Sequence, residues 1–311
     1  MLKVAQTVDL SPYNPLWPSL FEKEAARLKA ALGENCMTIH HIGSTAVPGL
    51  SAKPIIDMLP VVRDILKINT AAIEALGHKG RGELGMPFRR YFSNGIYHVH
   101  IWEKEADEIQ KHLLFRDYLR THPDARRAYQ SLKEKLAAKF GDQRPAYTLK
   151  KDPFIKEILR KAGFQGFEFV EPISEDWQHY HRIRQEQIFD RHPHVVYDPN
   201  HWTLSHPNHF HFVFKKLDEV IGVVHVELLD DQRAAVRSFA IDKPYQNQGH
   251  GSHLLKLVEK WVKHQGKSMI QLHSNPSALM FYERASYTPH PFPEGEPGLD
   301  KNAIDLMKNL R

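Results

Sequence analysis

A helix stop followed at once by a strand pattern divides the chain near its middle. Apolar residues recur at helical spacing through 154–159, and Lys161 and Gly163 then supply the basic last turn and the glycine that end a helix. The next residues, FEFVEPI, alternate apolar and polar side chains as a half-buried strand does. Because 311 residues make about two ordinary domains, we expect two domains, 1–165 and 166–311.

The two halves differ in charge. Residues 1–163 contain 26 Lys and Arg against 18 Asp and Glu, whereas residues 164–311 contain 16 against 19. The basic half predicts an anionic ligand, and we expect a nucleotide or phosphate compound rather than nucleic acid, although charge alone does not separate these. The weakly acidic half favours a cationic small-molecule or peptide partner.

No segment predicts export or membrane insertion. The N-terminus lacks the apolar stretch of a secretory signal, and no window approaches the ~18 apolar residues of a membrane span. The single cysteine, Cys36, cannot form an internal disulfide, which suits a reducing compartment. We therefore expect a cytoplasmic protein with no membrane partner.

Hydrophobic periodicity predicts an α/β (α+β) architecture in both halves. In the first half, Ser19 and Glu22 form a candidate capping box for a helix. After this helix, the first half predicts strands at 37–42, 54–62 and 97–102, a helix at 65–76 and helices after 105. The second half predicts strands at 167–172, 209–217, 220–229, 234–241, 269–273 and 303–307, with helices at 249–264 and 277–284.

The stretch QNQGHG lies between the strand at 234–241 and an amphipathic helix. Gly249 and Gly251 therefore stand at a helix N-terminus, where free N–H groups and the helix dipole favour a phosphate. Without side chains, the glycines let such a group approach closely. A tight turn between strand and helix would also explain two glycines, so the neighbouring sequence has to decide between a turn and a phosphate site.

That context resembles the GNAT acetyltransferases, whose signature Q/R-x-x-G-x-G/A matches residues 246–251, and whose next strand and helix match NPSALMFYER. The resemblance covers residues 167–311 and implies acetyl-CoA as cofactor. It implies that the pantetheine arm of acetyl-CoA pairs with the main chain of Phe239, Ala240 and Ile241. This main chain would be exposed by a split between the strand at 234–241 and the next strand. The implied cofactor contacts are completed by Gln246, Asn247, Gln248, Gly249, His250, Gly251, Ser252, Asn275 and Tyr282.

The same resemblance makes Tyr282 the candidate general acid that protonates the leaving thiolate. The general base is open. Ala235 stands where some members of the family have a glutamate, whereas His225 and Glu227 share one face of a strand and could take the proton. A packing role for each of these residues is the alternative.

The second half holds 14 of the 21 histidines. His209 and His211 lie on one face of a strand, but no cysteine is near and no complete zinc ligand set is apparent. We predict histidines at the surface or in the acceptor groove, and no metal.

The first half contains the stretch HHIGSTAVPGLSAKPIIDMLPVV. This stretch predicts a strand, a turn at Gly43-Ser44 and a second strand that carries Asp57. Such a turn can hold phosphate, and a carboxylate can carry a divalent metal. The stretch resembles the nucleotidyltransferase superfamily, and more closely its GrpB branch, over nearly all of residues 8–163. The basic and polar residues predicted to form an anion site are Gly43, Ser44, Lys53, Asp57, Arg89, His98, His100, Arg116 and Lys150, with Arg90 and Lys151 as further candidates.

Leu59 replaces the second carboxylate of the D-x-D pair found in active nucleotidyltransferases. A two-metal site is therefore incomplete unless Glu83, Asp117 or another residue supplies a ligand. The favoured hypothesis is an acetyltransferase with a phosphate-binding first domain. The alternatives are nucleotidyl transfer by the first domain with the second as acetyl-CoA sensor, and two binding modules without catalysis.

Overall fold

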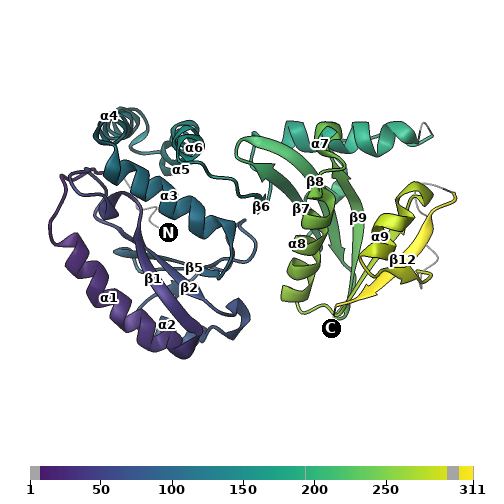
Figure 1. Ribbon diagram of the computed structural model, residues 1–311, viewed down its shortest axis with the longest axis horizontal. Coiled ribbons are helices and arrows are strands. Elements are labelled where there is room, and N and C mark those ends of the chain that lie inside the picture. Colours follow the sequence, from purple (N-terminus) through teal and green to yellow (C-terminus); the bar gives the residue numbers. More distant parts are fainter. Residues whose placement is uncertain (1–7, 193, 293–300, 311) are drawn as a thin grey trace. The chain divides into compact units, whose positions relative to one another are not determined.

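The computed structural model describes residues 8–192, 194–292 and 301–310 (Figure 1). The chain forms two compact units: residues 1–84 with 88–166, and residues 85–87 with 167–311. Among the described residues, no helix has both the length and the apolar composition needed to cross a membrane.

A five-stranded mixed sheet forms the centre of the first unit. β2 and β5 pair in parallel, and the other neighbours are antiparallel. In spatial order the strands are β1 (Cys36–Ile42), β2 (Ile56–Val62), β5 (Tyr97–Glu103), β4 (Arg90–Ser93) and β3 (Lys79–Gly80).

Helices lie on both sides of this sheet (Figure 1). α1 (Trp17–Leu32) and α2 (Thr70–Glu74) cover one face, where Ile56, Met58 and Val99 join the core. Since side chains alternate along a strand, Asp57, His98 and His100 face the other side. The helices of that side are α3 (Asp107–Thr121), α4 (Pro123–Phe140), α5 (Arg144–Leu149) and α6 (Asp152–Lys161).

Two local predictions for this unit were wrong. α1 begins at Trp17, because Pro18 fits the first turn of a helix, and Ser19 Oγ donates to the carbonyl of Leu16 instead of capping the helix. The helix predicted at 65–76 is a 3-10 turn at Ile65–Lys67 followed by the short α2, which Asn69 caps by accepting the N–H of Ala72.

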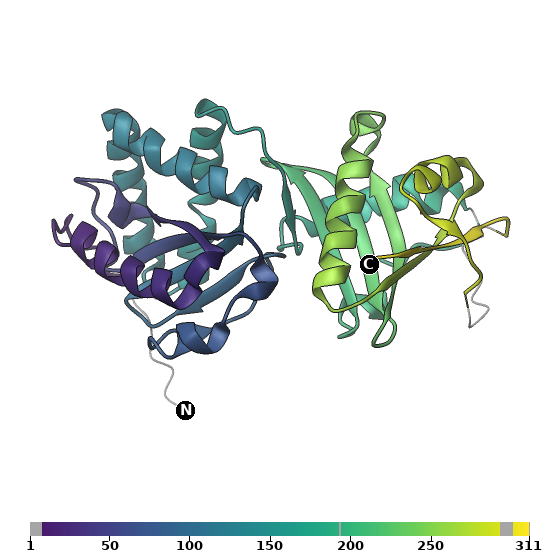
Figure 2. The same cartoon turned by 60° about the horizontal axis from the view of Figure 1, so that its bottom comes forward.

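The second unit contains a seven-stranded sheet with helices on both faces. Figure 2 shows α8 (His250–His264) in front of this sheet and α7 (Trp177–Gln187) behind it. α9 (Leu279–Arg284) follows β10. In spatial order the strands are β11 (Thr288–Pro289), β12 (Ile304–Asn309), β10 (Met269–Ser274), β9 (Arg233–Ile241), β8 (Glu219–Leu228), β7 (His209–Lys216) and β6 (Glu168–Val170).

The alternation of β7 separates an apolar face from a histidine-rich one. Phe210 and Phe212 pack on Trp261 of α8, with ring centroids 4.9 and 4.8 Å apart. His209 and His211 therefore point to the opposite face, toward α7. The cross-strand register places them beside Glu227 and His225 of β8, respectively.

Candidate functional sites

The loop between β9 and α8 presents free backbone N–H groups. Gly249 is the N-cap of α8 at a φ of 83°, and a Cβ there would meet nothing within 4 Å. Among the described residues, the N–H groups of Asn247, Gln248 and Gly249 have no hydrogen-bond acceptor. The first turn of the helix adds further free N–H groups. This arrangement suits a diphosphate.

The amide side chains of the loop hold its shape. Gln246 Nε2 donates to the carbonyl of Ile241 at 2.8 Å and to Gln187 Oε1 at 3.0 Å, and Gln248 Nε2 donates to the carbonyl of Pro244 at 2.8 Å. The main-chain N–H groups are therefore the donors left for an anion. Of the other predicted loop residues, His250 and Gly251 are half-buried and Ser252 is exposed.

The parallel strands β9 and β10 separate partway along their length. Their pairs run from Arg233↔Met269 to Val236↔Leu272, after which β9 continues to Ile241 without a partner on this side. A bulge in β9 against β8 falls at the same level, and bulges are frequent beside active sites. Residues 239–241 thus have no partner strand in β10, although Ala240 pairs with Val223 of β8 and the Ile241 carbonyl accepts from Gln246.

A cavity of about 680 Å³ opens at this separation. Its wall includes Phe239 and Asn275, both predicted to contact the cofactor, and Tyr282, the predicted acid. Asn275 Oδ1 accepts the N–H of Ser277 at 2.9 Å and so shapes the turn before α9.

Tyr282 on α9 is only 8% exposed. Its hydroxyl makes no hydrogen bond to a described residue, and its ring packs edge-on against Tyr287 at 5.5 Å. Burial raises the pKa of the Tyr282 phenol above its ordinary value. The phenol is therefore protonated at neutral pH and can donate a proton into the cavity.

His225 and Glu227 line the same cavity. Glu227 Oε2 accepts from Arg237 Nε at 2.5 Å, and Glu227 Oε1 lies 3.7 Å from Nε2 of His209. Nδ1 of His209 in turn lies 2.8 Å from Nε2 of His225. Burial, together with the neighbouring His211, lowers the pKa of His225 well below its usual range. His209 thus connects the two predicted bases, a role that the sequence did not indicate.

The carbonyl of Thr203 fixes the tautomer of His211, because it can only accept. His211 Nε2 donates to the carbonyl of Thr203 at 3.1 Å, so its Nδ1 accepts the Tyr180 hydroxyl at 2.6 Å. The ring of His211 stacks on that of His225, with centroids 4.2 Å apart. Burial lowers the pKa of His211 to about 4. Both stacked imidazoles are therefore neutral at neutral pH.

Arg184 of α7 also lines the cavity and is 8% exposed. Its guanidinium lies 5.3, 5.7 and 5.6 Å from the ring centroids of Tyr180, Phe189 and Tyr197. The hydroxyls of Tyr180 and Tyr197 accept hydrogen bonds from Arg184, but within the described part of the chain no carboxylate pairs with it and its Nε has no hydrogen-bond partner. Nothing in the sequence of this segment indicated that one of its arginines would face a cavity.

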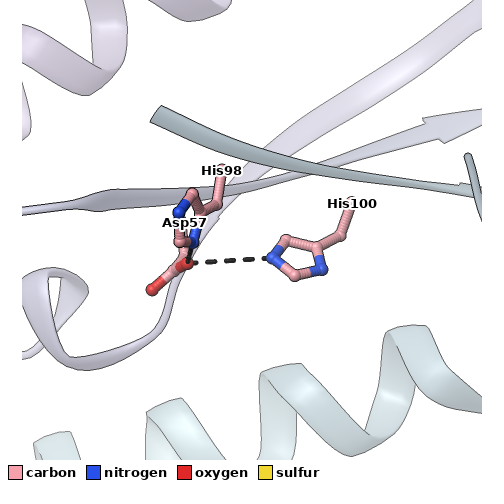
Figure 3. A group of neighbouring side chains, drawn as sticks. All are labelled: Asp57, His98 and His100. Atoms are coloured by element: carbon pink, nitrogen blue, oxygen red, sulfur yellow. Dashed lines mark ion pairs between the residues drawn. The ribbon is translucent and has the colours of Figure 1, made fainter. Parts of the chain in front are cut away.

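In the first unit, the parallel pairing of β2 with β5 brings a carboxylate and two imidazoles together (Figure 3). Asp57 Oδ1 lies 3.3 Å from His98 Nδ1 and 3.7 Å from His100 Nε2. Burial raises the pKa of Asp57, but the imidazoles of His100 and His98 lower it by more, so this carboxyl is ionised. Burial lowers the pKa of His100, whose ring is therefore neutral.

Cations line a cavity of about 370 Å³ beside these three residues. Lys133 Nζ lies 3.2 Å from Ser44 Oγ, and burial, together with Lys151, lowers the pKa of Lys133 to about 7. Burial and neighbouring cations lower the pKa of Lys53 to about 8. The basic residues of the wall are Lys53, Arg89, Lys133, Arg144 and Lys151, and Asp57 is the only carboxylate among the described lining residues.

Most residues of the predicted anion site meet at this cavity. Gly43 has a φ of 71°, and a Cβ there would collide with the Asp57 carboxylate. Arg116 is elsewhere: it donates to the carbonyl of His41 at 3.0 Å and pairs with Asp117. Lys150 is exposed and does not line the cavity. The predicted residues in the wall are Ser44, Lys53, Asp57, Arg89, His98, His100 and Lys151.

Known proteins resemble each half of the chain separately. The sequence profile described as GrpB protein matches residues 7–161, and that of the acetyltransferase (GNAT) family matches residues 173–287. UPF0157 protein YqkA of Bacillus subtilis (strain 168) is 43% identical over 161 residues, which are 50% of this chain and 47% of YqkA. This chain therefore spans less than half the length of YqkA.

Two proteins named GrpB match over nearly their whole lengths. The glutamate-rich protein GrpB of Alkalihalophilus pseudofirmus is 32% identical over 165 residues, which are 50% of this chain and 95% of that protein. The crystal structure of the conserved protein GrpB from Enterococcus faecalis is 42% identical and covers 50% of this chain and 96% of its own, with a TM-score of 0.47.

Proposed function

The chain belongs to the GrpB family over its first half and carries an acyltransferase domain of the GNAT family in its second, and we propose that this second domain transfers the acetyl group of acetyl-CoA to an amine. The separation of β9 from β10 carries the proposal. It leaves one edge of β9 without a partner strand beside the cavity, and the loop that follows β9 leads to the N-terminus of α8.

The residues of this path fit acetyl-CoA. The free N–H groups of residues 247–249 and of the first turn of α8 suit its diphosphate. The edge of β9 at 239–241, which has no partner strand in β10, suits the amide groups of its pantetheine arm, and Asn275 stands at the turn that borders the cavity. When bound there, acetyl-CoA supplies the thioester carbonyl that an amine attacks.

The side chains of the cavity handle the two protons of the transfer. Tyr282, protonated and without a hydrogen-bond partner among the described residues, donates its proton to the leaving sulfur and regains one when the nitrogen loses its second proton on forming the amide. Glu227 takes the proton of the incoming ammonium group, directly or through water, and His209 and His225 extend the polar path beside it. Arg237 holds the Glu227 carboxylate in place at 2.5 Å.

We propose that the first domain binds a phosphate-bearing ligand in the cavity lined by Lys53, Lys133 and Lys151. Nucleotidyl transfer by this domain, with the second as acetyl-CoA sensor, is the alternative. Leu59, fully buried at the position of the second carboxylate, favours binding over transfer.

A thiol-release assay tests the acetyl transfer. The full chain is incubated with acetyl-CoA and a panel of primary amines, and products are identified by mass spectrometry. Free CoA and an acetylated amine should appear together. Absence of turnover with every amine, combined with absence of acetyl-CoA binding by calorimetry, would overturn the proposal.

A further inference from the structure

We propose that Asp57, His98 and His100 bind one divalent transition-metal ion, and that the cation-lined cavity beside them brings a phosphate group to that ion. This goes beyond the phosphate binding proposed above and does not depend on acetyl transfer. Within the described part of the chain, no other group of three His, Cys, Asp or Glu side chains is placed to hold a metal ion.

The strand register brings the three donor atoms together. Asp57 of β2 is directly opposite His98 of β5, and His100 follows on the same face. The donor atoms all lie within 4.8 Å of one another, and both rings are directed at the carboxylate (Figure 3). Two atoms each bound at about 2.1 Å to one ion lie about 3 to 4 Å apart, which matches the 3.3 and 3.7 Å distances.

Protein contacts alone do not satisfy His100. Its Nε2 is 3.7 Å from Asp57, which is too far for a hydrogen bond, and its Nδ1 is buried without a partner among the described residues. A half-buried imidazole with one nitrogen unpartnered among the described residues and the other 3.7 Å from a carboxylate leaves room for a ligand between the two groups.

The ligand set selects the class of metal. Two imidazole nitrogens and one carboxylate oxygen suit Zn²⁺, Mn²⁺, Fe²⁺ or Co²⁺, whereas Mg²⁺ and Ca²⁺ prefer oxygen ligands throughout. Three protein ligands leave coordination positions open. The five basic residues of the adjoining wall would attract a phosphate, whose oxygens can fill those positions.

Cobalt binding tests the metal site. The full chain, without a histidine tag and stripped of metal by a chelator, is titrated with Co²⁺ while the visible absorption is recorded. We expect one tight ion per chain with ligand-field bands, and a spectral shift on adding pyrophosphate. Asp57→Asn and His98→Gln should each remove the tight ion, whereas His122→Gln, an exposed histidine outside the site, should leave it unchanged.

Each outcome bears on the proposal. Tight Co²⁺ binding that persists in both variants would place the ion elsewhere, for example among the histidines of the second unit, and would overturn the metal site. Binding without a pyrophosphate shift would overturn the phosphate contact. Thermal unfolding serves as the control for folding. A cooperative transition in each variant, with a midpoint close to that of the parent, shows that the variant is folded and has lost only the metal.

A second observation concerns the acceptor and rests on the proposed acetyl transfer. We infer that the amine carries a carboxylate, which Arg184 binds. A buried guanidinium without a counterion is costly unless a ligand supplies the charge. Arg184 faces the cavity, the hydroxyls of Tyr180 and Tyr197 accept from it, and among the described residues its Nε has no partner and no carboxylate neutralises its charge. This guanidinium can bind a carboxylate through two parallel hydrogen bonds.

Matched acceptors test this inference. Amino acids are compared with their amides in the thiol-release assay, with parent protein and with Arg184→Met and Arg184→Lys. We expect a higher kcat/KM for the free acids, lost in Arg184→Met and partly restored in Arg184→Lys. Equal rates for acids and amides in the parent would contradict the carboxylate contact while leaving acetyl transfer intact. Absence of turnover with all acceptors would instead count against the proposed function.

Discussion

Val236 of β9 and Leu272 of β10 form the last pair of the parallel ladder in the second sheet. Beyond this pair the strands part, and the cavity that holds Tyr282 and Glu227 opens between them. One local change in strand pairing thus leaves the edge of β9 without a partner strand and opens the cavity on which the proposed chemistry depends.

Tyr282→Phe tests the general acid. Removing the hydroxyl should lower kcat by about 10²- to 10⁴-fold, the usual contribution of a positioned acid, while the acetyl-CoA dissociation constant stays the same. Steady-state kinetics and calorimetry measure the two quantities. Tyr287→Phe removes a hydroxyl from the adjacent ring, which does not line the cavity, and should retain kcat. Equal rates for Tyr282→Phe and the parent would exclude the acid role.

Glu227→Gln tests the base. The amide keeps the shape of the side chain but cannot accept the ammonium proton, so kcat should fall by about 10²-fold or more. The fall in kcat should be smaller at high pH, because a larger share of the acceptor amine is then already deprotonated. A pH–rate profile that is unchanged in shape and height would show that Glu227 is not the base.

Lys133→Met tests the phosphate cavity of the first domain. An anion stabilises the charged form of Lys133, whose pKa of about 7 lies far below the usual range. Binding of inorganic phosphate near pH 7.5 should therefore take up a fraction of a proton, at most about one per site, and weaken as pH rises. Calorimetry in buffers of different ionisation enthalpy measures this uptake. Lys133→Met should bind phosphate more weakly and lose most of the uptake.

The neutral histidines under α7 predict acid sensitivity. The pKa of His211 is about 4 in the folded protein, below the unfolded value of 6.5, so the unfolded state binds more protons between these values. Stability should therefore fall as pH drops below 6.5, by about 2 kcal/mol at pH 5 from His211 alone. Chemical unfolding of the parent and of His211→Gln measures this, and the variant should lose less stability between pH 7 and 5.

The sequence predicted the strands and the glycine loop well because these depend on local patterns. Strand alternation placed β7 to β10, and the helix after Gly249 follows from its apolar stripe. The segment at 65–76 was predicted as one helix because its apolar spacing resembles one, yet the first turn ends at Ile68 and Asn69 then caps a shorter helix. Local signals of this kind compete, and only tertiary packing decides between them.

The candidate sites depend on contacts between distant strands, which periodicity does not reveal. Asp57 and His98 meet because β2 and β5 pair in parallel in one particular register. The sequence placed both histidines in an anion pocket and predicted no metal site. Likewise Lys151 lines the cavity while Lys150 is exposed, and both lie in the turn between α5 and α6, where no helical or strand periodicity predicts which side chain faces inward.

The most direct test of the proposed acetyltransferase is acetyl-CoA binding to two matched glycine variants. Gly249 and Gly266 border opposite ends of α8, have φ values of 83° and 78°, and leave open space where a Cβ would stand. Valine at either position should cost a similar 1–2 kcal/mol of stability. Calorimetry should show that Gly249→Val loses acetyl-CoA affinity by tenfold or more, whereas Gly266→Val binds as the parent does. Unchanged affinity in Gly249→Val, or equal losses in both variants, would contradict a cofactor site at the β9–α8 loop.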